Sequence, residues 1–229
     1  METIHQILRW THIAAGFTAF FVAPVAMVTK KGGKKHRFWG KVYFWAMIVG
    51  VTLSLILAPY INNLFLFSIG VFSFHLTFFG RRALLRKRPD KGQRATTVDY
   101  VVIVAAILTG IFMLVQGIMH QAILGIIFGI GIVAGLIPDL KKMIKPPADK
   151  NEWFFEHIGG MTGSYIASLT AFSVTNLHFL PTLVQWLWPS VVIIPILSMV
   201  IRKYKIKFAG GRRPADVAEV RLALIPDNA

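Results

Sequence analysis

The sequence predicts an all-α membrane protein, a bundle of seven transmembrane helices with the N-terminus outside and the C-terminus in the cytoplasm. Of its 229 residues 55% are hydrophobic and only 15% are charged, whereas a soluble domain carries about 25% charged residues. The apolar residues gather into runs of about 20, the length that crosses a hydrocarbon core. The basic residues lie in alternate connections between these runs, as the positive-inside rule requires of cytoplasmic loops.

Seven runs are apolar enough to span, and turn-forming or charged residues separate them. They are Trp10–Thr29, Val42–Tyr60, Ile61–Gly80, Val98–Gly117, Gln121–Pro138, Trp153–Thr175 and Leu180–Ile201. The second and third runs touch, but Pro59 followed by Asn62 and Asn63 predicts a tight reversal rather than one long helix. We therefore expect a transmembrane domain over residues 1–207 and a short polar cytoplasmic tail over residues 208–229.

Individual runs carry further signals. Lysines follow the first run instead of preceding it, so we expect a retained helix and not a cleaved signal peptide. The fifth run contains Gly125-x-x-x-Gly129 and Gly131-x-x-x-Gly135. Small residues four apart favour close helix packing, and the other interpretation is a homo-oligomer or a membrane partner docking there. Trp186 in the seventh run suits the outer membrane interface.

The distribution of charge gives the orientation. All of the 25 Lys and Arg residues except Arg9 lie in the first, third and fifth connections or in the tail. With seven spans these four segments fall on one side, which is then the cytoplasm, whereas six or eight spans would scatter them. The net charge of +15 would suggest nucleic acid in a soluble protein. Its position instead predicts membrane lipids as partners, with anionic headgroups at the basic loops and no nucleic acid.

Several kinds of chemistry are excluded by composition. The chain has no cysteine, which rules out disulfides, thiolate metal sites and cysteine nucleophiles. It also contains no phosphate-binding Walker loop, no His-Glu-x-x-His and no Gly-x-Ser-x-Gly. No catalytic residue is predicted, and whether the protein is an enzyme stays open at this point.

Three histidines are predicted to lie in one layer near the cytoplasmic face. His36 is in the first basic connection, His75 is about five residues before the arginines that end the third run, and His157 is one turn into the sixth. Imidazoles on different helices at similar depth are what haem b or a divalent metal ion needs. We hypothesise His75 and His157 as ligands and His36 as a lid or third ligand. The alternative is that each buried histidine bonds to a backbone carbonyl or side chain, with no cofactor.

The sixth run is unusually polar for a span. An ionisable pair, Glu156 and His157, stands at its start, and small or hydroxyl residues recur along one face. The functional interpretation is a polar cavity or translocation path lined by Glu156, Gly160, Ser164, Tyr165 and Ser168. The alternative is a packing seam of small residues in which the serine hydroxyls bond back to their own helix.

Two stretches resemble a known family. The first is His12-x-x-x-Gly16, Ala23-Pro24, Lys30-Lys31-Gly32, His36-Arg37-x-x-Gly40-Lys41-x-Tyr43 and Met47; the second is His157-Ile-Gly-Gly-Met161-x-Gly163-Ser-Tyr165, continuing to Asn176. Together they resemble an uncharacterised bacterial membrane-protein family, catalogued as domain of unknown function 2306. The resemblance implies a small multi-helix protein of the bacterial inner membrane without an assigned activity. It also implies that His12, His36, Arg37 and His157 are family-motif residues.

A fainter similarity links the chain to di-haem b-type cytochromes, which also have a histidine early in the first helix. Here, however, no run carries two histidines stacked across the membrane, so at most one haem near the cytoplasmic face is expected. The leading hypothesis is a histidine-lined polar cavity that binds haem or a metal ion for electron transfer. The alternatives are a cofactor-free transporter or binding protein for lipids or small molecules, and a structural subunit of a membrane complex.

Overall fold

A computed structural model describes residues 2–210, and over these residues the chain forms seven α-helices and two short 3-10 helices, without a strand. The α-helices are α1 (Glu2–Val28), α2 (Lys34–Tyr60), α3 (Leu64–Arg82), α4 (Thr97–Met119), α5 (Ile123–Ile144), α6 (Glu152–Asn176) and α7 (Thr182–Phe208). The 3-10 helices η1 (Ala83–Leu85) and η2 (Pro89–Lys91) lie between α3 and α4. The all-α class predicted from the sequence is confirmed.

The chain divides into two units, residues 1–187 and residues 188–229. The first holds α1 to α6 and the first turn of α7, and the second holds the rest of α7, including Pro189 and Pro195. The predicted polar tail lies outside the described residues from position 211 onward.

Each predicted run corresponds to one helix, although the helices extend beyond most of the predicted limits. Within the described part of the chain, every one of these helices except α6 is long and apolar enough to cross a membrane, which makes six. The exception is the run that the sequence marked as unusually polar. Seven spans and their orientation therefore remain predictions.

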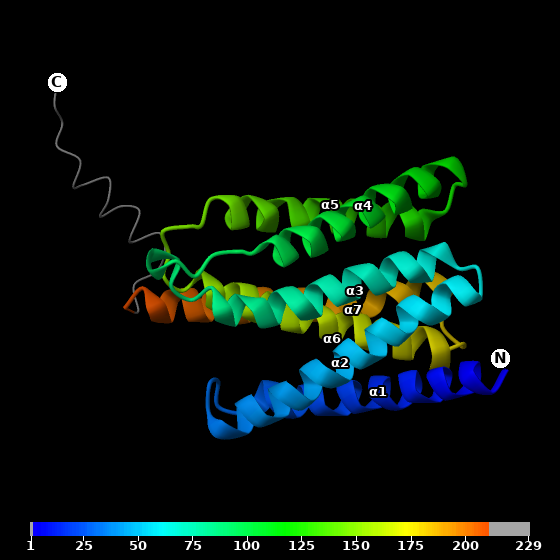
Figure 1. Ribbon diagram of the computed structural model, residues 1–229, viewed down its shortest axis with the longest axis horizontal. Coiled ribbons are helices and arrows are strands. Elements are labelled where there is room, and N and C mark those ends of the chain that lie inside the picture. The colour runs from blue at the N-terminus through cyan, green and yellow to red at the C-terminus, as the bar shows by residue number, and fades with distance from the viewer. Residues whose placement is uncertain (1, 211–229) are drawn as a thin grey trace. The chain divides into compact units, whose positions relative to one another are not determined.

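Three connections that carry basic residues lie at one end of the first unit (Figure 1). They are residues 29–33, 83–96 and 145–151, and we call this end of the bundle the basic end. At the other end, α2 and α3 are joined by the predicted reversal. Asn62 adopts a φ of 52°, and the side chain of Asn63 accepts a hydrogen bond of 2.9 Å from the amide of Leu66. The asparagines thus end one helix and cap the next.

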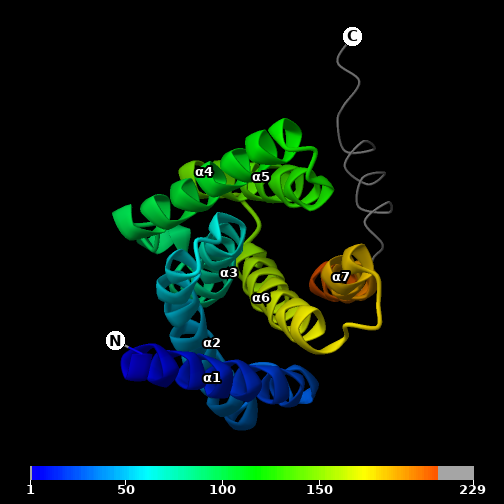
Figure 2. The same cartoon turned by 90° about the vertical axis from the view of Figure 1, so that its right-hand side faces the viewer.

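Helices α3 and α6 lie between two antiparallel pairs, α1–α2 and α4–α5 (Figure 2). Phe79 of α3 packs into an apolar cluster with Ile103 and Ala106 of α4 and with residues of α5. A second cluster joins α1 to α2 through Ala19 and Tyr43. Because α3 contacts α2, α4 and α6, it connects both pairs to the polar helix.

The polar helix α6 comes very close to α3 where the two helices cross. A Cβ added to Gly160 would lie 2.6 Å from the Cα of Gly80, and one added to Gly80 would lie 2.8 Å from the amide nitrogen of Met161. Both contacts are with backbone, which cannot swing aside as a side chain can. Glycine at both positions is therefore what allows the two helices to touch.

The glycines of α5 do two different things. Gly125 and Gly129 pack on α4, where an added Cβ would meet Gly117 at 3.0 Å and the amide of Leu114 at 2.5 Å. An added Cβ at Gly131 or Gly135 meets nothing within 4 Å. The motif Gly125-x-x-x-Gly129 thus packs against α4 of the same chain. The motif Gly131-x-x-x-Gly135 faces away from the other described helices.

Gly160→Ala should lower the free energy of unfolding by about 1–3 kcal/mol, the usual effect of overpacking a close contact. The measurement is thermal or denaturant unfolding of the purified protein in lipid nanodiscs. Gly159→Ala is the matched control, because a Cβ there meets nothing within 4 Å. That neighbour should be neutral, or more stable by up to about 1 kcal/mol from helix propensity. Equal effects at the two positions would contradict the close crossing.

Candidate functional site

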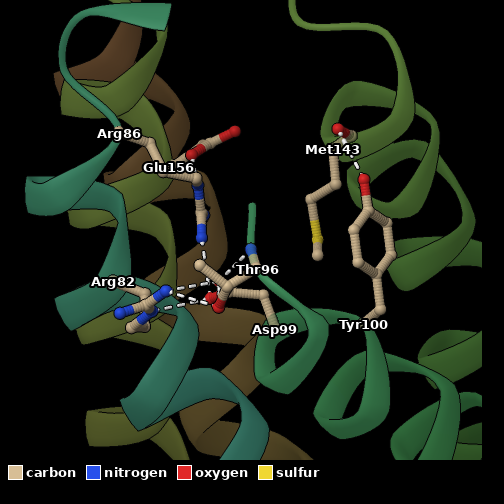
Figure 3. A network of polar contacts seen from close by, with 7 residues as sticks. All are labelled: Arg82, Arg86, Thr96, Asp99, Tyr100, Met143 and Glu156. Atoms are coloured by element: carbon tan, nitrogen blue, oxygen red, sulfur yellow. Dashed lines mark hydrogen bonds and ion pairs between the residues drawn. The ribbon is translucent and has the colours of Figure 1, made fainter. Parts of the chain in front are cut away.

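The most extensive polar arrangement at the basic end is built around Asp99, at the start of α4. Its carboxylate receives two bonds from Arg82 of α3, Nε to Oδ1 at 2.8 Å and an Nη to Oδ2 at 2.6 Å (Figure 3). Thr96 donates to Oδ2 through both its amide and its hydroxyl, each at 2.8 Å, and forms a capping box with Asp99. Helix capping thus fixes the carboxylate, and the carboxylate fixes Arg82.

Arg86 extends this network to α6. One Nη donates to Oδ1 of Asp99 and the other to Oε2 of Glu156, each at 3.1 Å. The side chains of Arg86, Asp99 and Glu156 are only 8%, 2% and 9% exposed. The guanidinium also lies over the ring of Phe79, 4.8 Å from its centroid. Removing one member of a buried pair leaves an uncompensated charge, so these groups depend on one another.

A second set of ion pairs joins α5 to α6. Nζ of Lys142 lies 2.7 Å from Oε1 of Glu152 and 3.7 Å from Oδ1 of Asp139. The hydroxyl of Tyr100 on α4 donates to the carbonyl of Met143 at 3.0 Å (Figure 3). The ends of α3, α4, α5 and α6 are therefore held together by charged and polar contacts at this level.

A pocket opens beside these ion pairs, between the connections 83–96 and 145–151. About 40 Å3 of it is open to the centres of water-sized molecules, more than the roughly 10–15 Å3 that one water needs. Five cationic and three acidic side chains line it, together with Trp153: Arg86, Lys87, Arg94, Lys142, Lys150, Asp149, Glu152 and Glu156. Nζ of Lys87 lies 4.4 Å from the centroid of the Trp153 ring. The pocket is therefore lined by more positive than negative groups.

The structure brings His36 and His157 together but gives each a backbone partner. Their ring centroids are 6.4 Å apart. Nδ1 of His36 lies 2.8 Å from the carbonyl oxygen of Ala26, and Nδ1 of His157 lies 2.7 Å from that of Gly80. Because a carbonyl only accepts, both Nδ1 atoms carry a proton, and in a neutral ring Nε2 keeps its lone pair. Both histidines thus fasten one helix to another.

Two of the remaining predicted histidines are placed differently. His12 lies between α1 and α2, with Nδ1 2.8 Å from the carbonyl oxygen of Gly50. His75 stacks on Phe79, with ring centroids 5.3 Å apart. Among the described residues, Phe79 is the only aromatic ring that His75 contacts. His75 therefore does not join His36 and His157 as a third ring, and no group of three or more His, Asp or Glu suited to a metal ion occurs within residues 2–210.

The other predicted positions are divided between the pocket and the helix contacts. Glu156 lines the pocket, whereas Gly160 packs on Gly80. Ser164 donates back to Met161 and accepts from the hydroxyl of Tyr43 at 2.7 Å. Tyr165 packs beside the α1–α2 cluster, Ser168 is half-buried, and Arg37 is exposed. In the connection before Arg37, burial lowers the pKa of Lys31, whose ammonium donates to the carbonyl of Met27.

Sequence reasoning did not identify the network around Asp99. By sequence, Arg82 and Arg86 serve only as charges that indicate the orientation; in the structure Arg82 ends α3 and Arg86 directly follows η1. The useful signal was Thr96-x-x-Asp99, a capping pattern directly before an apolar run. An acidic residue at the start of an otherwise apolar span, opposite two arginines that end the preceding one, indicates an ion pair.

Asp99→Asn should destabilise the protein by about 3 kcal/mol or more, because Arg82 and Arg86 lose a buried counter-charge. Unfolding in lipid nanodiscs measures this directly. Asp90→Asn makes the same chemical change at an exposed position in η2 and should alter stability by less than about 0.5 kcal/mol. A small effect at Asp99, similar to that at Asp90, would show that the network does not hold these helices.

Comparison with known proteins gives a family but no characterised relative. No curated protein and no solved structure matches the chain, and the similarity to b-type cytochromes receives no support. A family model described as "Predicted membrane protein (DUF2306)" matches residues 9–141. This is more than half of the chain, from α1 into α5, and includes His12, His36 and Arg37 but ends before His157. The chain therefore belongs to the family of predicted membrane proteins DUF2306.

Proposed function

We propose that this protein binds a small anion, without a resident cofactor, in the pocket at its basic end. The observation that carries the proposal is the set of cations at the rim. Arg86 and Lys142 are paired with acidic partners, but Lys87, Arg94 and Lys150 form no ion pair with any described residue. Asp149 is the one acidic lining residue outside these ion pairs, so three cations and one carboxylate leave the pocket with a net positive charge, which favours a negatively charged ligand.

The chemistry expected of the ligand is a phosphate or carboxylate group. Its source is either a free anion in solution or the headgroup of an anionic lipid. The lipid source is supported by Trp153, which lies under Lys87, because tryptophan and lysine both favour the membrane interface. Binding of either kind fits a transporter or a lipid-binding membrane protein better than electron transfer.

We further propose the seven-span topology in the bacterial inner membrane, with the basic end in the cytoplasm and the N-terminus outside. Helix α6 has 25 residues, about 38 Å at 1.5 Å per residue, which exceeds a hydrocarbon core of about 30 Å. Several of its polar side chains find partners outside α6: Glu156 pairs with Arg86, His157 with the carbonyl of Gly80 and Ser164 with Tyr43. A helix satisfied in this way can cross a membrane inside a bundle without being apolar.

Single cysteines test this topology without interference, since the chain has none of its own. In intact cells of a bacterial host, a membrane-impermeant maleimide should label Asn62→Cys and Gln121→Cys but not Lys91→Cys or Lys150→Cys. After the cells are broken, all four should react. Labelling of Lys150→Cys in intact cells would place the start of α6 outside and exclude the proposed arrangement.

The anion site is tested by removing the three unpaired charges together, as Lys87→Gln/Arg94→Gln/Lys150→Gln. Binding should weaken by about tenfold or more, since each exposed cation contributes up to about 1 kcal/mol and about 1.4 kcal/mol is a factor of ten. Calorimetry with inorganic phosphate and retention of phosphatidylglycerol measured by native mass spectrometry distinguish the two sources. Lys30→Gln/Lys34→Gln/Lys35→Gln is the control, with the same change of charge at the basic end but outside the pocket.

Phosphate binding lost only in the pocket variant would identify a free anion. Retention of phosphatidylglycerol lost only in that variant would identify a lipid headgroup. If the wild-type protein binds neither probe, or if both triple variants behave alike, the proposal is wrong.

A second candidate is haem b or a divalent metal ion bound by His36 and His157. Two imidazoles that share one ion through Nε2 at about 2.0–2.1 Å have ring centres about 6 Å apart, and here the separation is 6.4 Å. Both rings also donate Nδ1–H to a carbonyl, as metal-ligating histidines usually do. Relative to the sequence hypothesis, His36 takes the place of His75 as the partner of His157.

The absorption spectrum and metal content of gently purified protein test this candidate. It predicts a Soret band or about one metal ion per chain, lost in His36→Gln and kept in His120→Gln, an exposed histidine far along the sequence. A spectrum without a Soret band, together with no stoichiometric metal, would eliminate it and leave anion binding unaffected.

A further inference from the structure

A second cavity lies at the end of the bundle opposite the basic end, between the start of α3 and the crossing of α4 with α5 (Figure 1). Its volume is about 430 Å3, within the range of roughly 300–1,000 Å3 of pockets that bind small molecules. Leu64 and Phe65 of α3 form one wall, and Phe112 and Met113 of α4 form another. Because Leu64 and Phe112 are exposed, the cavity is open to the outside of the bundle.

Packing on other residues holds the sides of this cavity in place. Gly117 lines it, and an added Cβ there would lie 2.6 Å from the amide nitrogen of Ile126, so α4 and α5 already touch at this point. The ring of Phe65 packs on Trp186 and Phe128, with centroids 5.1 and 6.1 Å away. A turn of Phe65 into the cavity would break both ring contacts. The space is therefore formed before any ligand binds.

The chemistry of the lining differs from that of the pocket at the basic end. None of the described residues that line this cavity is Lys, Arg, Asp or Glu, and only Gln116 and His120 are polar. A ligand with a charged head group would find no counter-charge here. Gln116 is half-buried, and its side-chain amide makes no hydrogen bond to another residue within 2–210. Since lipid chains offer no partner to an amide, a head group that accepts a hydrogen bond would satisfy it.

The polar and apolar parts of the cavity follow the order of a bilayer. Helix α4 is apolar enough to span and ends at Met119, so Gln116 lies about 4–5 Å from its end at 1.5 Å per residue. This is near the level of the lipid headgroups. Phe112 and Met113 lie about one turn deeper. A lipid whose head group meets Gln116 would thus place its chain against apolar side chains of α3 and α4.

We propose that this cavity binds a neutral lipid, a molecule with a long hydrocarbon chain and an uncharged head group. A carbonyl or hydroxyl oxygen of the head group accepts a hydrogen bond from the amide of Gln116, and the chain fills the apolar part of the cavity. The site lies at the opposite end of the bundle from the anion pocket and takes a ligand of different chemistry. It therefore does not rest on the proposed anion binding.

The test is native mass spectrometry of the full chain with dioleoylglycerol and dioleoylphosphatidylglycerol, which carry the same two chains and differ in the charged phosphate. The wild type should retain dioleoylglycerol. Gln116→Leu should weaken this retention by about three- to tenfold, the effect of one hydrogen bond, and Ala122→Trp should abolish it by filling the cavity. The controls make the same changes at exposed positions outside the cavity, as Gln6→Leu and Ile118→Trp. Both controls should behave like the wild type.

The proposal is wrong if the wild type does not retain dioleoylglycerol, or if the two cavity variants retain it as well as their controls do. A loss in Ala122→Trp but not in Gln116→Leu would overturn the part given to the amide. If Ala122→Trp lowers the retention of dioleoylphosphatidylglycerol as much as that of dioleoylglycerol, the cavity does not select a neutral head group, which also contradicts the proposal.

One further variant separates this site from the anion pocket. Lys87→Gln/Arg94→Gln/Lys150→Gln changes only residues at the basic end, so it should retain dioleoylglycerol as the wild type does. A loss in this variant equal to that in Ala122→Trp would contradict a site at the opposite end of the bundle.

Discussion

The close crossing of α3 and α6 at Gly80 and Gly160 is the constraint on which the rest of the basic end depends. Since the two backbones touch, the carbonyl of Gly80 comes within 2.7 Å of Nδ1 of His157. Arg86, which follows α3 and η1, donates a hydrogen bond to Glu156 on α6, the helix that also carries His157. A side chain at either glycine would push α6 away and separate both pairs. The ion pairs around Asp99 then add α4 to the same assembly.

A polar helix within an apolar bundle needs internal partners, and α6 has them. Lipid provides no donors or acceptors, so each buried polar group must be satisfied by the protein or by what it binds. On α6 the protein itself does this through Tyr43, Gly80 and Arg86. Because these polar side chains are bonded within the bundle, they argue against a translocation path along α6. Among the described residues, three cations of the pocket beside Glu156 have no ion-pair partner, and the ring nitrogens of His75 have no hydrogen-bond partner.

Much of the fold was predictable from the sequence, because runs of apolar residues and the positions of glycine, proline and asparagine determine where helices begin and end. The grouping of basic connections and the placing of Glu156 and His157 near them followed from the same pattern. What hydropathy does not determine is the rotation of each helix about its axis. The sequence therefore assigns His75 and His157 to their helices but not the direction in which each ring points: the ring contact of His75 is with Phe79, while that of His157 is with His36. The network around Asp99 depends on the same missing information.

The most direct test of this account is a cross-link between α3 and α6. A Cβ added to Gly163 would lie 3.7 Å from Cγ of Leu76, about where the sulfur of a cysteine at position 76 would be, which is close to disulfide geometry. With a protease site placed in the exposed residues 90–93, Leu76→Cys/Gly163→Cys should give fragments that stay joined after mild oxidation in membranes. Leu76→Cys/Gly159→Cys should not, because a Cβ at Gly159 meets nothing within 4 Å. Equal cross-linking of both pairs, or none in the first, would contradict the crossing at Gly80 and Gly160.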